Sequence, residues 1–189
     1  VIAGDNSELF FNSTIIGHDV LFSGTNENDF DAESGDDIMI QGESVIRNEG
    51  MFGFDWVSFE EHTSFGADAD MRIKIFTNVE LDILRNRFDR VEAMSGSALN
   101  DVLIGDDRFE TDVDPLDPEA LVVENFFTGD ELTREGVERV AGFAEVLQPV
   151  IGDLNQFAAT DTVFNAGNVL LGGDGSDIIQ GGGGDDIID

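Results

Sequence analysis

This chain of 189 residues has no cysteine, no tyrosine and only three prolines. Without cysteine no disulfide can form, and a structural zinc site is not expected, because such sites depend on cysteine thiolates. No stretch approaches the roughly 18 apolar residues of a membrane-spanning helix. The glycine-rich stretch 172–184 also lacks the Lys-Ser/Thr pair of a phosphate-binding loop.

Basic residues are scarce as well: nine Lys and Arg stand against 41 Asp and Glu, which gives a formal net charge of −32. A surface of this charge repels nucleic acids and anionic membranes, so we expect no nucleic-acid partner and no direct membrane insertion. The same surface attracts cations. The hydrophobic content of 41% is high enough for a buried core, so the acidic residues belong to a folded protein.

The C-terminal stretch consists of two nonapeptides in one register, Gly172–Gln180 and Gly181–Asp189. Each has glycine at positions 1, 2 and 4, aspartate at position 6 and isoleucine at position 8, the G-G-x-G-x-D-x-U-x pattern. Glycine permits backbone angles that turn carbonyl oxygens toward one point, and the aspartate adds an anionic oxygen. Because Ca²⁺ takes six to eight oxygen ligands, we predict calcium loops here. Their candidate ligands are Gly172, Asp174, Asp177, Gly181, Gly183 and Asp186.

The same nine-residue frame recurs elsewhere in the chain with fewer glycines. Its units are Thr14–Phe22, Ser23–Asp31, Ala32–Ile40, a degenerate Gln41–Glu49, Gly50–Ser58, Gly96–Ile104 and Val163–Leu171. Apart from the degenerate unit, which has Ile46 there, position 6 holds an acid or amide that is a further candidate metal ligand: Asp19, Asn28, Asp37, Asp55, Asp101 and Asn168.

These nonapeptides resemble the RTX, or hemolysin-type, calcium-binding repeats. The resemblance implies a mainly β fold, a parallel β-roll in which two nonapeptides make one full turn, and several Ca²⁺ ions as cofactors. It also implies a role as a calcium-binding, calcium-dependent folding module of a larger protein, non-catalytic by itself. That parent would be a secreted or cell-surface bacterial protein, and the partners of the module would be calcium ions and the rest of the parent polypeptide.

Loops on one edge of such a roll recur at every second nonapeptide. Asp19, Asp37 and Asp55 are each two nonapeptides apart, so we predict that they lie on one edge and that Asp37 sits between the other two. Asn28 is predicted on the opposite edge, where the residues two nonapeptides away on either side have apolar side chains. We therefore expect one edge to bind calcium well and the other weakly or not at all.

The same spacing applies in the C-terminal array. It places Asn168 and Asp186 on one edge. Asp177 has no such neighbour, because residue 159 is an alanine. The spacing therefore predicts no neighbouring ligand for Asp177 on its edge.

The chain divides into four predicted segments: an N-terminal RTX array (1–58), a β spacer ending in one RTX-like unit (59–104), a partly helical insertion (105–162) and a truncated C-terminal RTX array (163–189). In the spacer, alternating residues predict a strand over Met71–Phe76, and apolar spacing over Leu81–Val91 predicts a short helix or buried turn. In the insertion, Thr133 is the predicted N-cap of a helix that Pro149 limits. Its apolar stripe should pack on the flank of the roll.

A second, broader resemblance covers Phe54–Arg108 and Thr133–Asp189. These stretches are similar to the calcium-binding region of large bacterial proteins of the animal haem-peroxidase family. The resemblance implies an exported multidomain parent. It implies no peroxidase chemistry for this chain, because nothing supplies the proximal histidine and distal acid–base group that haem enzymes need.

Two other functions remain open. Asp114-Pro115 and Asp117-Pro118 are chemically labile bonds, so the chain could be a calcium-triggered self-cleaving module, although Asp and Pro also simply form turns and helix starts. The other hypothesis is an adhesin extender domain, in which calcium stiffens a stalk. His62 lies near serines and acids, but no G-x-S-x-G elbow is present, and we expect no catalytic residue.

Overall fold

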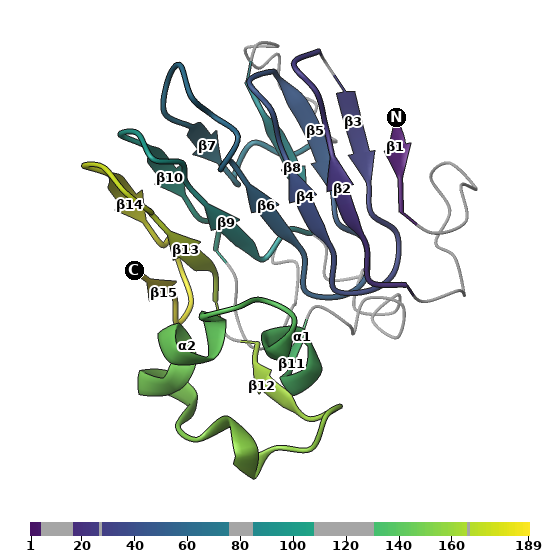
Figure 1. Cartoon of the computed structure of the whole chain (residues 1–189), viewed down its shortest axis with the longest axis vertical. Coiled ribbons are helices and arrows are strands. Elements are labelled where there is room, and N and C mark those ends of the chain that lie inside the picture. The colour runs from purple at the N-terminus through teal and green to yellow at the C-terminus, as the bar shows by residue number, and fades with distance from the viewer. Residues whose placement is uncertain (5–16, 27, 76–84, 108–130, 166) are drawn as a thin grey trace.

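A computed structural model of the chain describes residues 1–4, 17–26, 28–75, 85–107, 131–165 and 167–189 (Figure 1). These residues form mainly β-structure, made of short parallel strands with a small helical segment beside them. The predicted class, mainly β with parallel sheets, is confirmed at this level.

The largest sheet has six parallel strands in the order β15-β13-β9-β6-β4-β2. In chain order they are β2 (Val20–Phe22), β4 (Ile38–Ile40), β6 (Trp56–Ser58), β9 (Ala93–Ser95), β13 (Val169–Leu171) and β15 (Ile187–Ile188). All except β9 begin at position 7 of a predicted nonapeptide.

Two further parallel sheets share a core with the six-stranded sheet. One has the order β1-β3-β5-β8 and the other the order β14-β10-β7. Their strands are β1 (Ile2–Ala3), β3 (Asn28–Asp31), β5 (Ile46–Glu49), β7 (Asp68–Asp70), β8 (Arg87–Asp89), β10 (Val102–Ile104) and β14 (Ile178–Gln180). From β2 to β6, and again from β13 to β15, the chain alternates between the six-stranded sheet and these two.

Within both arrays, paired strands are separated by two nonapeptides, except that Ile2 of β1 pairs with Phe30 of β3. Val20 pairs with Ile38, Ile38 with Trp56, and Val169 with Ile187. The degenerate unit Gln41–Glu49 keeps this register, because Asn28 pairs with Ile46. The predicted spacing of neighbouring loops is therefore confirmed within each array.

One apolar core lies between the sheets, and most strands contribute a single inward side chain to it. These side chains include Leu21, Phe30, Met39, Val57, Ala69, Phe88, Met94, Leu103 and Leu170, all buried. Asn48 interrupts the series as a fully buried amide in β5. Its Nδ2 donates to Gln41 Oε1 (3.2 Å), and Gln41 Nε2 donates to Asn86 Oδ1 (2.9 Å), so hydrogen bonds satisfy both amide nitrogens, whereas Asn48 Oδ1 is buried with no hydrogen-bond partner among the described residues.

The turns that enter the strands repeat one backbone conformation. Positions 2 and 4 have positive φ at Glu33 (75°) and Gly35 (139°), Met51 (79°) and Gly53 (122°), Gly173 (87°) and Gly175 (125°), and Gly182 (110°) and Gly184 (112°). Glu33 and Met51 therefore adopt a left-handed conformation that favours glycine. Turns with and without the glycine consensus share one shape, so the nine-residue frame is structural in both arrays.

The insertion contains a short antiparallel pair, β11 (Leu132–Thr133) with β12 (Thr162–Phe164), and three helical elements. These are α1 (Arg134–Glu138), α2 (Phe143–Ile151) and the 3₁₀ helix η3 (Leu154–Gln156). The Thr133 hydroxyl accepts a hydrogen bond from the Gly136 backbone N–H (3.1 Å), which confirms Thr133 as an N-cap.

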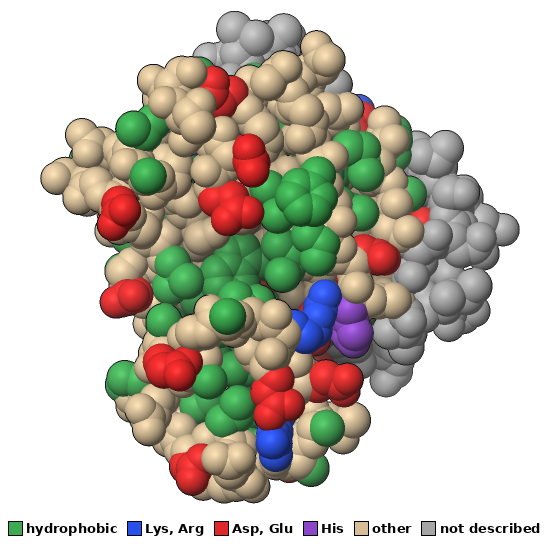
Figure 2. Space-filling model, in the orientation of Figure 1, with side chains coloured by type: hydrophobic (Ala, Val, Ile, Leu, Met, Phe, Trp, Pro, Cys, Tyr) green, Lys and Arg blue, Asp and Glu red, His purple; other side chains and the backbone are tan. Residues whose placement is uncertain are grey.

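The helical segment packs on the outer face of the six-stranded sheet, as its apolar stripe predicts (Figure 1). Val137, Phe143 and Leu147 are buried in one cluster with sheet residues, and the rings of Phe143 and Trp56 meet edge to face at 4.8 Å. Hydrophobic side chains gather in the centre of this face, with acidic side chains around them (Figure 2). Phe22, on the outer face of β2, remains 60% exposed.

The prediction of one helix ending at Pro149 is wrong in its bounds. Gly142 has φ 85° and separates α1 from α2. Pro149 lies inside α2, near its end, where its missing N–H removes only one helical hydrogen bond. The helix ends instead at Gly152, whose φ of 77° is outside the helical range.

Two predictions in the spacer are also wrong. Met71–Ile75 form turns with one isolated bridge from Lys74 to Phe88, and the strand is Asp68–Asp70 instead. The cause is local, because Arg72 donates from its backbone and side chain to Asp70 and folds the chain back. Within the predicted helix or turn 81–91, residues 81–84 lie outside the described part, and Arg87–Asp89 pair with β5 as a strand.

The repeated turn conformation makes a prediction about stability. Met51→Gly should stabilise the fold or leave it unchanged, because glycine adopts φ 79° without the strain of a side chain. Gly53→Ala should destabilise it by about 1–3 kcal/mol or more, because φ is 122° and the new Cβ would lie 1.8 Å from the Gly35 carbonyl oxygen. Urea unfolding of both variants measures this difference. Equal effects of the two substitutions would contradict the shared turn conformation.

Candidate metal centre

A ladder of side chains runs along the edge where the chain enters the six-stranded sheet. We name it the carboxylate ladder, and its members are the residues directly before each strand: Asp19, Asp37, Asp55, Glu92, Asn168 and Asp186. Asp37 Oδ1 accepts from the Asp19 backbone N–H (2.6 Å), and Asp55 Oδ1 accepts from that of Asp37 (3.0 Å). The predicted placement of Asp19, Asp37 and Asp55 on one edge is confirmed.

The ladder continues past Asp55, beyond the three aspartates that the nine-residue spacing places on this edge. Glu92 Oε2 accepts from the Asp55 backbone N–H (2.6 Å), and Asp186 Oδ1 accepts from that of Asn168 (2.8 Å). Since β9 pairs with both β6 and β13, the two arrays share this one edge. Asp55 therefore lies inside the ladder.

Glu92 was missed because its unit carries neither glycine nor aspartate at the expected positions. Counting one nonapeptide back from Gly96 would have found it, since Arg87–Ser95 has Glu92 at position 6 and Met94 at position 8. The backbone does not keep the nine-residue frame here. Arg87–Asp89 form β8 and pair with Arg47–Glu49, so only Arg90, Val91 and Glu92 connect β8 to β9, whereas residues 50–55 connect β5 to β6. Arg90 has φ 50° within this shortened turn.

A second, shorter ladder lies on the other edge. Asp101 Oδ1 accepts from the Ala67 backbone N–H (2.5 Å), and Asp177 Oδ1 accepts from that of Asp101 (2.9 Å). The expectation that Asp177 stands alone is wrong. Its neighbour is 76 residues earlier, because the insertion separates two turns that are adjacent in space.

The remaining predicted ligands occupy different places. Asn28 pairs with Ile46, as expected, and its Nδ2 donates to the Asn26 carbonyl (2.8 Å), so it belongs to neither ladder. Gly172 and Gly181 lie against the carboxylates of their own units: an added Cβ would be 2.6 Å from Asp177 Oδ2 and 2.0 Å from Asp186 Oδ2. Two further predicted ligands lie apart from the ladders. Asp174 is exposed, and the Gly183 backbone N–H donates to Asp107 Oδ1.

The insertion interrupts a single turn. Gly105 follows β10 and stacks beside Gly181, and Asp107 forms a parallel bridge to Gly183. Gly167 and Asn168 then stack beside residues 185 and 186. Residues 105–107 and 167–168 therefore form one turn, which we name the split turn. The predicted unit Val163–Leu171 is not continuous, because Val163 and Phe164 lie in β12.

The split turn closes like an uninterrupted one. In the turn Gly96–Asp101, the N–H at position 2 (Ser97) donates to the side chain at position 6 (Asp101 Oδ2, 2.8 Å). In the split turn the N–H of Asp106 donates to Asn168 Oδ1 (3.0 Å), the same bond across 62 residues of sequence. The insertion therefore leaves and re-enters the fold at one closed turn.

The ladders offer oxygen ligands of the kind that calcium prefers. Asp19 Oδ2 is buried without a hydrogen-bond partner among the described residues. Carbonyl oxygens of one turn point at glycines of the next: a Cβ on Gly35 would lie 1.5 Å from the Gly17 carbonyl oxygen, and one on Gly175 would lie 2.2 Å from that of Leu99. Within the described ranges, no three Asp, Glu, His or Cys side chains gather into one group able to hold a metal. Loop carbonyls would therefore have to supply most of the ligands.

Acidic side chains also align across β3, β5 and β8. Asp31 pairs with Glu49, and Glu49 pairs with Asp89, at the ends of their strands. Burial raises the pKa of Glu49 to about 7, and the charges of Asp31 and Asp89 add to the effect. Burial likewise raises the pKa of Asp186. Ionisation of these groups in the absence of a cation works against the folded state.

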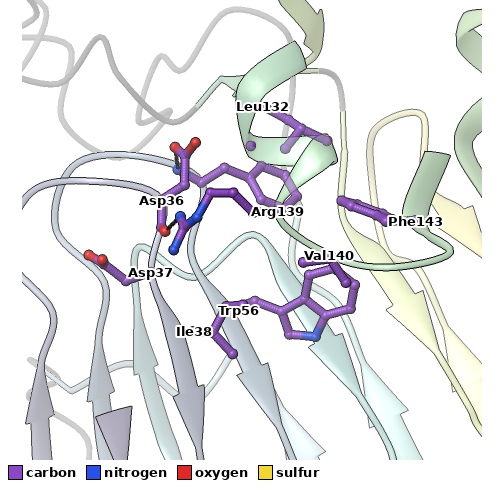
Figure 3. A pocket seen from close by; sticks show the side chains of 10 residues that line it. Asp36, Asp37, Ile38, Trp56, Leu132, Arg139, Val140 and Phe143 are labelled. Atoms are coloured by element: carbon purple, nitrogen blue, oxygen red, sulfur yellow. Dashed lines mark hydrogen bonds between the residues drawn. The ribbon is translucent and has the colours of Figure 1, made fainter. Parts of the chain in front are cut away.

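A pocket beside the ladder lies between the turn 32–37 and the helical segment (Figure 3). Its lining includes Asp36, Asp37, Trp56 and Phe143. Arg139, the C-cap of α1, reaches across it and donates to the Asp36 backbone carbonyl. The helical segment thus contacts a turn of the ladder through a cation as well as through its apolar stripe.

Among the described residues, neither histidine lies in a catalytic arrangement. His62 is 4% exposed, its Nε2 faces the Gly42 carbonyl oxygen (3.2 Å), and its ring contacts Phe59 and Phe65 edge to face. His18 is exposed, and its Nδ1 accepts from the Asp36 backbone N–H (2.8 Å). Both Asp-Pro bonds lie outside the described residues.

Comparison with known proteins adds no assignment: no family model, no curated protein and no solved structure matches this chain. In the described part of the chain, none of the helices has the length and apolar character needed to cross a bilayer.

The raised pKa of Glu49 predicts a pH dependence of the free energy of unfolding. Between pH 4.5 and about 7 the unfolded chain releases this proton while the folded chain keeps it, so stability should fall as pH rises through this range. Glu49→Gln should remove that fall, and at pH values above about 7 it should raise the free energy of unfolding by about 1–2 kcal/mol. Urea unfolding across pH measures it, with exposed Glu61→Gln as the control. A fall that persists in Glu49→Gln would contradict the assignment.

Proposed function

We propose that this chain is a calcium-binding module of the RTX type, folded as a parallel β-roll whose turns form with calcium. The observation that carries the proposal is the carboxylate ladder on repeated turns of one conformation. A purely structural ladder would stack acidic groups at low net benefit, since like charges at close range oppose ionisation. A bound cation removes that conflict.

The residues of the chain have separate tasks in this proposal. One carboxylate oxygen of a ladder member accepts an N–H from the neighbouring turn, which fixes the orientation of the side chain. The second oxygen, with carbonyl oxygens of the loops, is then available to the ion; Asp19 Oδ2 is an example. Glycine at position 4 lets neighbouring turns approach closely. Calcium supplies charge neutralisation and oxygen coordination when bound.

Calcium-dependent folding follows from the charge and the small core. With a net charge of −32, the metal-free chain repels itself, and glycine-rich turns lose much entropy on folding. The free energy of calcium binding would then be part of the free energy of folding. This suits a segment of a larger secreted or cell-surface protein that folds where calcium is plentiful. We propose no catalytic role for the segment.

Calcium titration tests the proposal. Excess chelator should lower the β content and enlarge the hydrodynamic radius, and calcium should restore both. Magnesium should not, because it demands a tighter octahedral shell and gives up water reluctantly. Circular dichroism and size-exclusion chromatography give the two readouts, and a gel of the calcium sample should show one intact band. An unchanged radius in chelator would rule out a folding switch.

Single substitutions in the ladder test which residues bind. Asp37→Asn keeps an oxygen to accept the Asp19 N–H but removes the charge, so calcium stoichiometry should fall while the hydrodynamic radius in chelator should not exceed that of the parent chain. Asp55→Asn should behave alike, because Asp55 is also inside the ladder. Asn28→Ala is the control and should change little. Isothermal titration calorimetry measures stoichiometry, and a larger loss in Asn28→Ala would overturn the assignment of edges.

A further inference from the structure

The split turn differs from the other turns of the ladder in its charges. Its position-6 residue is an amide, Asn168, which is fully buried. Asn168 Nδ2 donates to Asp106 Oδ1 (3.1 Å), and the Asp106 N–H donates back to Asn168 Oδ1 (3.0 Å). An amide donates and accepts at once, whereas an ionised aspartate only accepts. The pair therefore closes the turn through reciprocal hydrogen bonds, which leave the charge of Asp106 to be balanced by another group.

The only lysine of the sequence, Lys74, forms an ion pair with this turn. Lys74 Nζ lies 2.6 Å from Asp106 Oδ2, and the Asp106 side chain is 12% exposed. Lys74 belongs to the irregular segment after β7, held beside β8 by its bridge to Phe88. A charge-assisted bond of this length to a mostly buried carboxylate is among the stronger polar contacts of a protein.

We propose that Lys74 takes the place of a bound cation at the split turn, so that this turn stays closed at calcium concentrations that open the other turns. Four acids, Asp106, Asp107, Asp185 and Asp186, gather there, and burial together with the charges of the other three raises the pKa of Asp186. The Lys74 ammonium is a permanent counter-charge in that group. The two ends of the insertion, at Asp107 and Gly167, are then held together without metal.

This inference rests on the proposed function only in naming calcium as the ion that the other turns use. Its consequence is an uneven response to chelation. Strands β10 and β13, which flank the split turn, should keep amide protection in chelator, whereas β4 should lose it. Arg85 offers a matched control, because it makes an exposed ion pair with Asp68 in the same region.

Hydrogen–deuterium exchange in excess chelator tests it on the full chain. Lys74→Met removes the charge and keeps the stem, and we expect amides of Val102–Ile104 and Val169–Leu171 to exchange about tenfold faster than in the parent chain. Lys74→Arg and Arg85→Met should leave them unchanged. Protection in Lys74→Met equal to that of the parent would overturn the proposal, whether or not calcium binds elsewhere.

A second variant moves the test from chelator to calcium. Lys74→Met combined with Asn168→Asp recreates an anionic turn without its internal cation. It should bind one more calcium ion per chain than the parent and protect Val169–Leu171 only in calcium. A double variant with unchanged stoichiometry would contradict the inference. If the parent chain binds no calcium at all, the proposed function fails, while the effect of Lys74 in chelator is still decided by the exchange rates.

Discussion

The stacking of turns in one register is the constraint on which this structure depends. Within each array it places the strands of the six-stranded sheet beside one another at steps of two nonapeptides, and it also brings the residues before those strands into one line. A favourable feature, the continuous core, is therefore tied to an unfavourable one, a line of acidic groups. Every turn must resolve that conflict by a hydrogen bond, a counter-charge or, as we propose, a calcium ion.

The small core explains why this resolution matters. Most strands place one side chain between the sheets, and even that series contains a buried amide at Asn48. The helical segment adds a second apolar cluster on the outer face, centred on Trp56 and Phe143. That cluster spans β6, β9, β13 and β15, so it joins the two arrays across the insertion that separates them in sequence.

The sequence predicted what depends on local period and not what depends on long-range pairing. Strand starts, the common edge of Asp19, Asp37 and Asp55, and the N-cap Thr133 all follow from spacing or residue type. That Glu92 lies beside Asp55, and Asp101 beside Asp177, could not be predicted by counting nonapeptides, because the spacer and the insertion lie between turns that touch. The alternation of Met71–Phe76 failed for a different reason: contacts of Arg72 with Asp70 outweighed a weak strand preference.

At the split turn, the repulsion between acidic groups is relieved without metal, and this turn is the one that carries an insertion. A segment as long as this insertion can enter a turn only if the two ends of that turn hold each other without help from the chain between them. The reciprocal bonds of Asn168 and Asp106 provide this, and an aspartate at 168 would not, because two carboxylates would then face each other. Loss of the acid at position 6 is thus the condition under which this turn could accept an insertion, and Lys74 neutralises the acid that remains.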